Sequence, residues 1–255
     1  MPASLRIDQS YKRVFDDRGI AYQQAMFNLP ASRYNEFNSL FARKPLKRYE
    51  SILDIPSGGG YLSSFIQRKY PELLISVTSV DFSESFITQN TSVGLAEENM
   101  FLYDSKKYYD RFVCLAASHH ISDINFFLEG LRPMAKEGAI FHIADVFPDS
   151  NIAKFLDVFV DSNTSTGHEG IYRDYALFDL PGWLEPINIE IRHCPWVFQN
   201  QQQMLAFCSS LFGLNPNLEK VALLQALNEY IGIAKRSKGI ALNWELQYCE
   251  FKACT

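Results

Sequence analysis

The sequence predicts an α/β fold in which a mostly parallel sheet is covered by helices on both faces. First, an apolar stretch at 51–55 leads into a glycine cluster and then into a helical pattern over 59–69. Second, the run at 112–117 is apolar without interruption, as in a parallel strand buried on both faces. Third, a helical pattern at 123–135 separates that run from another apolar run at 139–145, an alternation typical of α/β domains.

The composition limits the classes of protein to which the chain can belong. Its 255 residues suit one domain with insertions, although two small domains would also fit, and 47% hydrophobic residues can form a sizeable core. A net charge of −5 without a basic block argues against nucleic-acid binding. Five scattered cysteines without a CxxC pair favour reduced thiols and a cytoplasmic location. We expect no signal peptide or membrane span, because the sequence lacks a long apolar run.

Residues 1–48 are predicted to form an N-terminal helical cap ahead of the main domain at 49–255. Apolar residues recur at helical spacing between 8 and 45, and Pro30 divides the segment into two helices. The segment is rich in tyrosine and phenylalanine. It either packs on the domain as ordinary core or forms a lid over a ligand crevice.

The turn after the first strand indicates what kind of ligand binds there. Gly58 and Gly60 permit positive φ angles and a close approach of the backbone to a ligand, as in nucleotide-binding crevices. Asp54 would repel the pyrophosphate of a dinucleotide, and Ser63 stands where the dinucleotide motif has Gly or Ala. A nucleoside that carries a positive charge fits better. A purely structural glycine turn is the simpler alternative.

The pattern Asp54-x-x-x-Gly58-x-Gly60 resembles motif I of the class I S-adenosylmethionine-dependent methyltransferases. The resemblance implies a Rossmann-like, seven-stranded sheet whose last strand is antiparallel. It also implies that Asp54, Ser57, Gly58, Gly60 and Tyr61 bind S-adenosylmethionine, with S-adenosylhomocysteine as the product.

A second carboxylate follows the next predicted strand, at 74–80. Asp81 lies about 20 residues after the glycines, which is the spacing of a carboxylate that binds ribose hydroxyls. Phe82 is placed to pack on the adenine ring, although an apolar residue here also fits the core. The alternative role of Asp81 is to cap a helix that begins near Ser83, and the two roles are compatible.

The adenine contact departs from the family pattern. Residues 91–94 are predicted to form a short third strand. Family members commonly have an acidic residue after a glycine such as the one that ends this strand, but Leu95 stands at that position here. Backbone groups of Leu95 and Ala96 would then bind the adenine amino group.

The region of the fourth and fifth predicted strands carries the most specific resemblance. The fourth strand ends in His119-His120-x-x-Asp123, and a helix, a glycine and the fifth strand follow, as in the family. Together with the glycine turn and the second carboxylate, the resemblance extends over residues 50–147. It implies that Ala116, at the end of the fourth strand, also lines the cofactor site.

Candidates for catalysis come from the same edge of the sheet. His119 and His120 follow the fourth strand, and a histidine with a pKa near neutrality can act as a general base. Asp145, at the end of the fifth strand, is the third candidate. Each also has a simpler role in capping a helix or holding a turn. We expect no metal, because the chain shows no His, Asp or Glu cluster at ligand spacing, and we expect His142 and His193 to be packed or surface residues.

The C-terminal part completes the sheet and adds an insertion. A helix at 151–160 precedes an irregular segment at 161–185, which would lie near the mouth of the crevice or be a solvated loop. Alternating patterns at 187–198 and 239–251 predict the last two strands. Between them, two helical patterns, the second reaching residue 234, predict a helical insertion at 200–236.

The leading prediction is a methyltransferase that transfers a methyl group from S-adenosylmethionine to an oxygen, carbon or nitrogen atom of a small molecule. A protein of the same fold that binds S-adenosylmethionine or S-adenosylhomocysteine without turnover is the second interpretation. An NAD-dependent oxidoreductase is the third, and Asp54 and Ser63 argue against it. We expect a small-molecule acceptor as the partner, and neither nucleic acid nor membrane.

Overall fold

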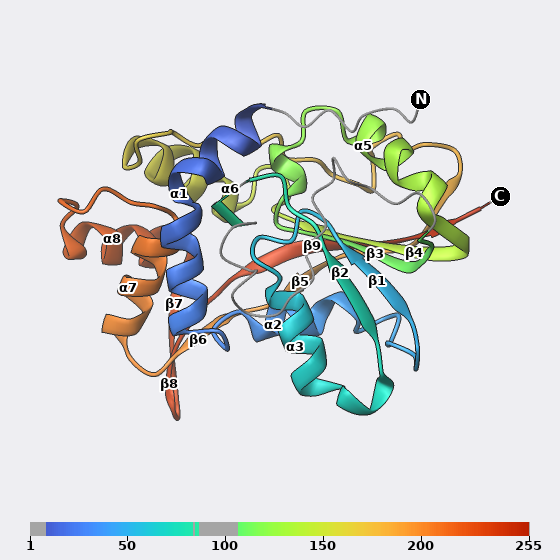
Figure 1. Ribbon diagram of the computed structural model, residues 1–255. Coiled ribbons are helices and arrows are strands. Elements are labelled where there is room, and N and C mark those ends of the chain that lie inside the picture. Colours follow the sequence, from blue (N-terminus) through green and yellow to red (C-terminus); the bar gives the residue numbers. More distant parts are fainter. Residues whose placement is uncertain (1–8, 84, 87–106, 255) are drawn as a thin grey trace.

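A mostly parallel sheet forms the centre of the molecule. The computed structural model describes residues 9–83, 85–86 and 107–254. Within these residues the main sheet has six strands (Figure 1), which are, in spatial order, β2 (Ser76–Ser79), β1 (Ser51–Asp54), β3 (Tyr109–Leu115), β4 (Ala135–Asp145), β9 (Glu245–Ala253) and β5 (Leu184–His193). The first four run parallel, and β9 is antiparallel to both of its neighbours, as predicted for the last strand. The strand predicted at 91–94 lies outside the described residues.

Helices cover both faces of this sheet, as predicted. On one side lies α5 (Ile124–Leu131), and on the other lie α2 (Tyr34–Leu40) and α3 (Tyr61–Lys69) (Figure 1). Successive side chains of a strand enter different cores, so that Ile52 packs on the α3 side and Leu53 on the α5 side. Because both faces are buried here, the second half of β3 is a continuous apolar run in the sequence.

The N-terminal segment forms two helices, the first of which reaches the C-terminal part of the chain. Helix α1 (Gln9–Asn28) packs along α7 (Gln201–Leu211). The remaining helical segments are short: η1 (Pro71–Leu73), η3 (Ser118–His120), η4 (Arg132–Met134), α6 (Asn151–Lys154), η5 (Phe155–Val160), α8 (Lys220–Ala226) and η6 (Leu227–Ile231). None of the helices in the described ranges is long and apolar enough to cross a membrane.

Two patterns that predict single strands each divide into two strands, so both predictions are wrong in this respect. The pattern at 187–198 forms β5 and β6 (Trp196–Phe198), and the pattern at 239–251 forms β8 (Gly239–Leu242) and β9. Pro195 separates the first pair, because it lacks the N–H that would continue the β5 ladder. Strands β6 and β8 leave the main sheet and pair with each other.

The predicted insertion at 200–236 is helical only in part. Its second helical segment ends at Ile231, where Gly232 adopts a positive φ of 87°. Strand β7 (Ile233–Arg236) follows and completes a three-stranded antiparallel sheet in the order β6-β8-β7. The prediction of helix up to residue 234 is therefore wrong at its end, because a glycine stops the helix earlier.

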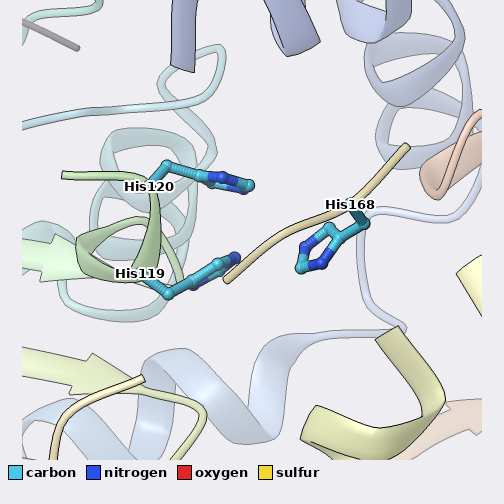
Figure 2. Close-up of side chains that lie close together, drawn as sticks. All are labelled: His119, His120 and His168. Carbon is cyan, nitrogen blue, oxygen red and sulfur yellow. The ribbon is translucent and has the colours of Figure 1, made fainter. Parts of the chain in front are cut away.

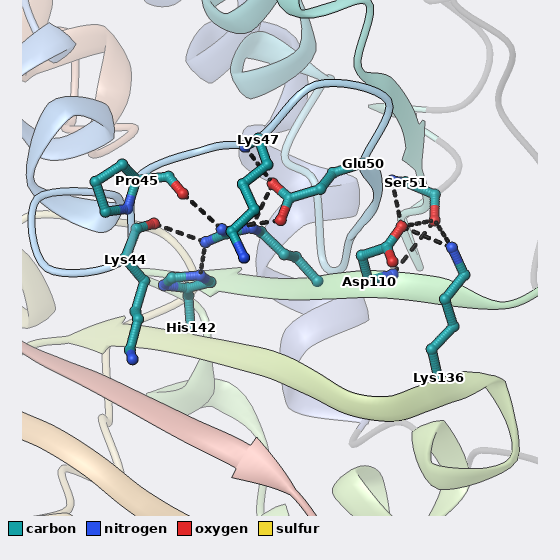
Figure 3. A network of polar contacts seen from close by, with 9 residues as sticks. Lys44, Pro45, Lys47, Glu50, Ser51, Asp110, Lys136 and His142 are labelled. Atoms are coloured by element: carbon teal, nitrogen blue, oxygen red, sulfur yellow. Dashed lines mark hydrogen bonds and ion pairs between the residues drawn. The ribbon is translucent and has the colours of Figure 1, made fainter.

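A buried arginine joins the loop before β1 to the middle of the sheet. Arg111 on β3 is 3% exposed and forms an ion pair with Glu50 at 2.9 Å. It also donates to the carbonyl oxygens of Lys44 and Pro45, both at 2.7 Å, and contacts His142 on β4 at 3.0 Å (Figure 3). His142 is thus a packed residue, as predicted, and the loop is held where it enters the first strand.

We expect Arg111→Met to lower the free energy of unfolding by about 3–5 kcal/mol, because Glu50 and two carbonyl groups lose their donor. The matched control is Lys136→Met, which removes an exposed pair with Asp110 (2.7 Å, side chains 44% and 30% exposed). That variant should lower the free energy of unfolding by less than ~1 kcal/mol. Urea unfolding followed by circular dichroism measures both, and equal losses in the two variants would contradict the structural role of Arg111.

Candidate active site

A cavity lies at the carboxyl ends of β1 and β3, against the N-terminal helices. It holds about 1030 Å³ of space between atoms, part of which is open to solvent. Asp54, the glycine turn and Ala116 form its sheet side, and residues of α1, α2 and α7 supply much of the remaining wall. Ligands of open α/β sheets bind at this edge. The N-terminal helices therefore line the crevice, which is the position that a lid would take.

The glycine turn has the conformation that the sequence predicts. Gly58, Gly59 and Gly60 have φ angles of 56°, 105° and 71°, which residues with a side chain rarely adopt. Helix α3 begins directly after Gly60. The backbone N–H of Gly58 donates to the carboxylate of Asp81 at 2.7 Å, and this bond ties the turn to the residue two positions after β2.

Asp54 is a buried carboxylate with an incomplete set of donors. It is 3% exposed and lines the cavity, and its Oδ2 atom has no hydrogen-bond partner among the described residues. Burial raises the pKa of Asp54 well above its usual value, and the nearby charge of Asp81 raises it further. A cationic group in the cavity would stabilise the ionised carboxylate, whereas a phosphate would not.

Asp81 is surrounded by internal donors. Its carboxylate accepts hydrogen bonds from the hydroxyl of Tyr11 (3.0 and 3.1 Å) and from the backbone N–H groups of Gly58, Phe82 and Ser83. Burial raises the pKa of Asp81 to about 6, although these donors act in the opposite direction. Tyr11 lines the cavity, but Asp81 does not. Phe82 packs edge-on against Tyr11, with ring centroids 5.7 Å apart.

Two of the three candidate catalytic residues form a hydrogen-bonded pair. Asp145 contacts Nδ1 of His119 at 2.7 Å and accepts from the hydroxyl of Ser118 at 2.6 Å. Burial alone would raise the pKa of Asp145, but the contacts with His119 and Ser118 outweigh burial and hold the pKa below its usual value. The ionised carboxylate fixes the imidazole ring and leaves its Nε2 atom for other contacts.

Three histidines meet at the cavity wall. His119 and His120 come from η3 and His168 from the 161–185 segment; all three are buried, and one nitrogen of each lies within 4.8 Å of the others (Figure 2). The expectation of no such cluster rests on spacing along the chain, and it does not hold for the folded chain. Burial lowers the pKa of His120 well below its usual value and also lowers that of His168, so both rings are neutral near pH 7.

The segment at 161–185 is held against the end of β3. Arg173 is 8% exposed and donates to three carbonyl oxygens of the turn at 118–122, at distances of 2.6 to 2.9 Å. His168 of the same segment is held by Asp161 and Asp157 and lies beside the other two histidines. Of the two interpretations of this segment, the structure favours the one that places it at the crevice.

Another wall of the cavity contains a buried ion pair that the sequence patterns do not single out. Arg33 and Glu36 pair at 2.6 Å, and both are buried. Arg33 also donates to the hydroxyl of Tyr22, and the indole N–H of Trp196 donates to Glu36, both at 2.6 Å. The available sequence signal is two opposite charges three residues apart within an otherwise aromatic helical segment.

The structure brings most of the predicted site residues to this cavity. Those that line it are Asp54, Ser57, Gly58, Tyr61, Ala116, His119 and His120. Predicted residues that adjoin these without lining the cavity are Gly60, Asp81, Phe82 and Asp145. Leu95 and Ala96 lie outside the described residues. His193 lies at the surface, with 82% of its side chain exposed, as expected.

Comparisons with known proteins identify the fold. No family model matches the sequence, and no curated protein matches it. A candidate methyltransferase from Bacillus halodurans covers 86% of this chain and 99% of its own, with a TM-score of 0.56 and 13% identity. Coclaurine N-methyltransferase, bound to N-methylheliamine and S-adenosylhomocysteine, covers 86% of this chain and 70% of its own, with a TM-score of 0.52 and 13% identity. The chain has the class I methyltransferase fold.

This fold also occurs in a protein named for another reaction. The [4+2]-cyclase SpnF covers 100% of this chain and 97% of its own, with a TM-score of 0.54 and 11% identity. At identities this low, the likeness to methyltransferases shows the fold alone. Function has to be argued from the residues of the cavity.

We expect Asp54→Asn to raise the free energy of unfolding at pH 7.5 by about 1–3 kcal/mol, because the neutral amide removes the cost of burying an ionised carboxylate. The raised pKa of Asp54 means that the folded state binds a proton more tightly than the unfolded state does. The wild type therefore gains stability as the pH falls toward the unfolded pKa, about 3.9, and the advantage of the variant should shrink over that range.

Urea unfolding at several pH values measures this difference. The control is Asp179→Asn, an exposed aspartate, which should change stability by less than ~0.5 kcal/mol. A loss of stability in Asp54→Asn at pH 7.5 would mean that Asp54 has partners that compensate its burial.

Proposed function

We propose that the protein is an S-adenosylmethionine-dependent methyltransferase that acts on a small-molecule acceptor. The observation that carries the proposal is the buried, incompletely paired carboxylate of Asp54 beside the glycine turn. An uncompensated buried carboxylate is costly unless a cation binds near it. S-adenosylmethionine brings an ammonium and a sulfonium group, and it supplies an already activated methyl group.

The residues proposed to hold this cofactor are those that the sequence indicates, and five of them line the cavity. The proposed residues are Asp54, Ser57, Gly58, Gly60, Tyr61, Asp81, Phe82, Leu95, Ala96 and Ala116. Asp81 would accept the ribose hydroxyls on the oxygens that now accept from Tyr11. The ribose hydroxyls would replace the Tyr11 hydroxyl as donors, so the Asp81 carboxylate would keep its hydrogen bonds while α1 adjusts.

The remainder of the cavity suits a small and largely apolar acceptor. Aromatic side chains supply much of its wall, including Phe15, Phe37, Phe212 and Trp244. Ligand sites of this kind combine an apolar lining with a few fixed polar groups. The cover of helices also limits water, which protects a reactive methyl donor. We propose an oxygen, nitrogen or carbon atom of such an acceptor as the site of methylation.

The cavity histidines are the proposed place at which the acceptor loses a proton. His119 is the first candidate, because Asp145 holds its ring and leaves Nε2 available. His120 is the second, and Asp145 acts as a positioning residue. A cytoplasmic location is also proposed, on the free thiols of the five cysteines.

Calorimetric titration with S-adenosylhomocysteine and with NAD tests the cofactor. We expect micromolar binding of the first and none of the second. Asp54→Asn and Asp81→Ala should each weaken S-adenosylhomocysteine binding by about 1–3 kcal/mol, or roughly 5- to 150-fold, because each removes a charged contact. The Asp179→Asn control should bind like the wild type.

The pH dependence of this binding provides a second measurement. Ribose hydroxyls donate to the ionised form of Asp81, whose pKa is about 6 in the free protein. The affinity for S-adenosylhomocysteine should therefore fall as the pH falls through about 6. In Asp81→Asn, this dependence on pH should be weaker. Equal binding by the wild type, Asp54→Asn and Asp81→Ala would contradict the cofactor site, and binding of NAD alone would contradict the function.

Turnover with a labelled methyl donor separates an enzyme from a protein that only binds the nucleoside. With an acceptor that carries an acidic proton, found by screening, we expect His119→Ala to lower turnover by about 10²- to 10⁴-fold. Its affinity for S-adenosylhomocysteine should stay close to that of the wild type. His193→Ala is the matched control and should retain full turnover. Unchanged turnover in His119→Ala would remove this residue from catalysis.

A further inference from the structure

The three cavity histidines are arranged as a group rather than as separate side chains. His119, His120 and His168 are 5%, 7% and 6% exposed, and their ring centroids lie 4.0, 5.3 and 5.5 Å apart. Their rings converge from two segments of the chain, and all three line the same cavity (Figure 2). Packing alone rarely gathers three polar rings in one buried place.

Two of the rings are oriented by carboxylates. Nδ1 of His119 contacts Asp145 at 2.7 Å, and Nδ1 of His168 contacts Asp157 at 3.1 Å. An N–H group on Nδ1 leaves the lone pair on Nε2 in both rings. Histidines that bind metals are held in the same way, with one ring nitrogen on a carboxylate and the other on the metal.

We propose that His119, His120 and His168 bind a divalent transition-metal ion, with Zn²⁺ as the first choice. Three protein ligands and one open position are the ligand set of catalytic zinc sites. Imidazole nitrogens suit zinc and its neighbours, whereas Mg²⁺ and Ca²⁺ prefer oxygen ligands. Metal binding at this place does not depend on the proposed methyltransferase function.

The distances require only a small closure of the site. Nitrogens of a tetrahedral zinc site with Zn–N bonds of 2.0–2.1 Å lie about 3.3 Å apart. One nitrogen of each histidine lies within 4.8 Å of a nitrogen of each of the other two, so these atoms need to approach by at most about 1.5 Å. Changes of side-chain rotamer supply movements of this size.

The surrounding charges are compatible with a dication. Asp145 and Asp157 hold their carboxylates against Nδ1 of His119 and of His168. Each carboxylate thus brings a negative charge to the outer side of a ring. Two arginines at this cavity carry the opposing charge. Arg33 is paired with Glu36, and the guanidinium of Arg18 donates to Thr164 at 2.8 Å and to neighbouring groups of the same segment.

A metal ion here specifies how the acceptor is activated, and this step rests on the proposed function. An alcohol acceptor in the fourth position would lose its proton to water, because coordination to the cation lowers the pKa of the hydroxyl. The oxygen would keep the electron pair that forms the new bond to the methyl carbon, while the bond from that carbon to the sulfonium sulfur breaks and S-adenosylhomocysteine leaves. With a metal bound, His119 would act as a ligand in place of its proposed role as the general base, and His119→Ala would lower turnover in either role.

The experiment is a titration of the chelator-treated, full-length protein with Zn²⁺ alone, followed by calorimetry and elemental analysis. We expect one equivalent of zinc per chain in the wild type. Affinity should fall by roughly 100-fold or more in His168→Ala, and by about 10- to 100-fold in Asp157→Asn, which loses only the carboxylate behind the ring. His168→Cys should restore binding, because a thiolate is also a zinc ligand.

His193→Ala is the matched control, because it removes an exposed histidine and should leave zinc binding unchanged. Thermal unfolding and S-adenosylhomocysteine binding report whether each variant is folded. Equal zinc binding by the wild type and His168→Ala, or no zinc binding by a wild type that binds S-adenosylhomocysteine, overturns the metal site alone. Zinc binding by a chain that does not bind S-adenosylhomocysteine supports the metal site and contradicts the proposed function.

Discussion

Parallel pairing of β1, β3 and β4 is the constraint on which the candidate site depends. It brings the carboxyl ends of the three strands to one edge of the sheet. Asp54 and Asp145 are the last residues of two of these strands, and His119 lies in the turn that follows the third. No local motif contains all three residues. A slip of one residue in the register would turn each side chain to the other face of the sheet and separate them.

The three buried carboxylates at this edge differ in how well they are paired. Asp145 is bonded to a histidine and a serine, and Asp81 is bonded to a tyrosine and three backbone N–H groups. Asp54 alone of the three has an oxygen without a partner among the described residues. A buried polar atom without a partner calls for an explanation. The two well-paired carboxylates can be explained by structure, and Asp54 is the one for which we propose a ligand.

Local sequence patterns predict the sheet edge that carries the site (the frame) but not the segments that pack over it (the walls). The apolar runs and the glycine turn are enough to predict the parallel sheet and to place Asp54 and His119 at its edge. They cannot predict that Tyr11 reaches Asp81 or that His168 joins the other histidines, because those contacts join segments far apart in the chain. An alternating apolar pattern likewise predicts a strand without indicating which sheet the strand joins. The pattern therefore does not predict that the segments 187–198 and 239–251 each divide into two strands.

The division between frame and walls also indicates where the chemistry of this chain is decided. Residues 50–147, which contain the motifs that resemble those of methyltransferases, supply the glycine turn, His119 and His120. The N-terminal helices, the 161–185 segment and the small antiparallel sheet supply Arg33, His168 and Trp196. The same fold occurs in an N-methyltransferase and in a cyclase, so the frame alone does not select a reaction. The histidine cluster joins the turn after β3 to the 161–185 segment, so a substitution in the cluster affects both parts of the site.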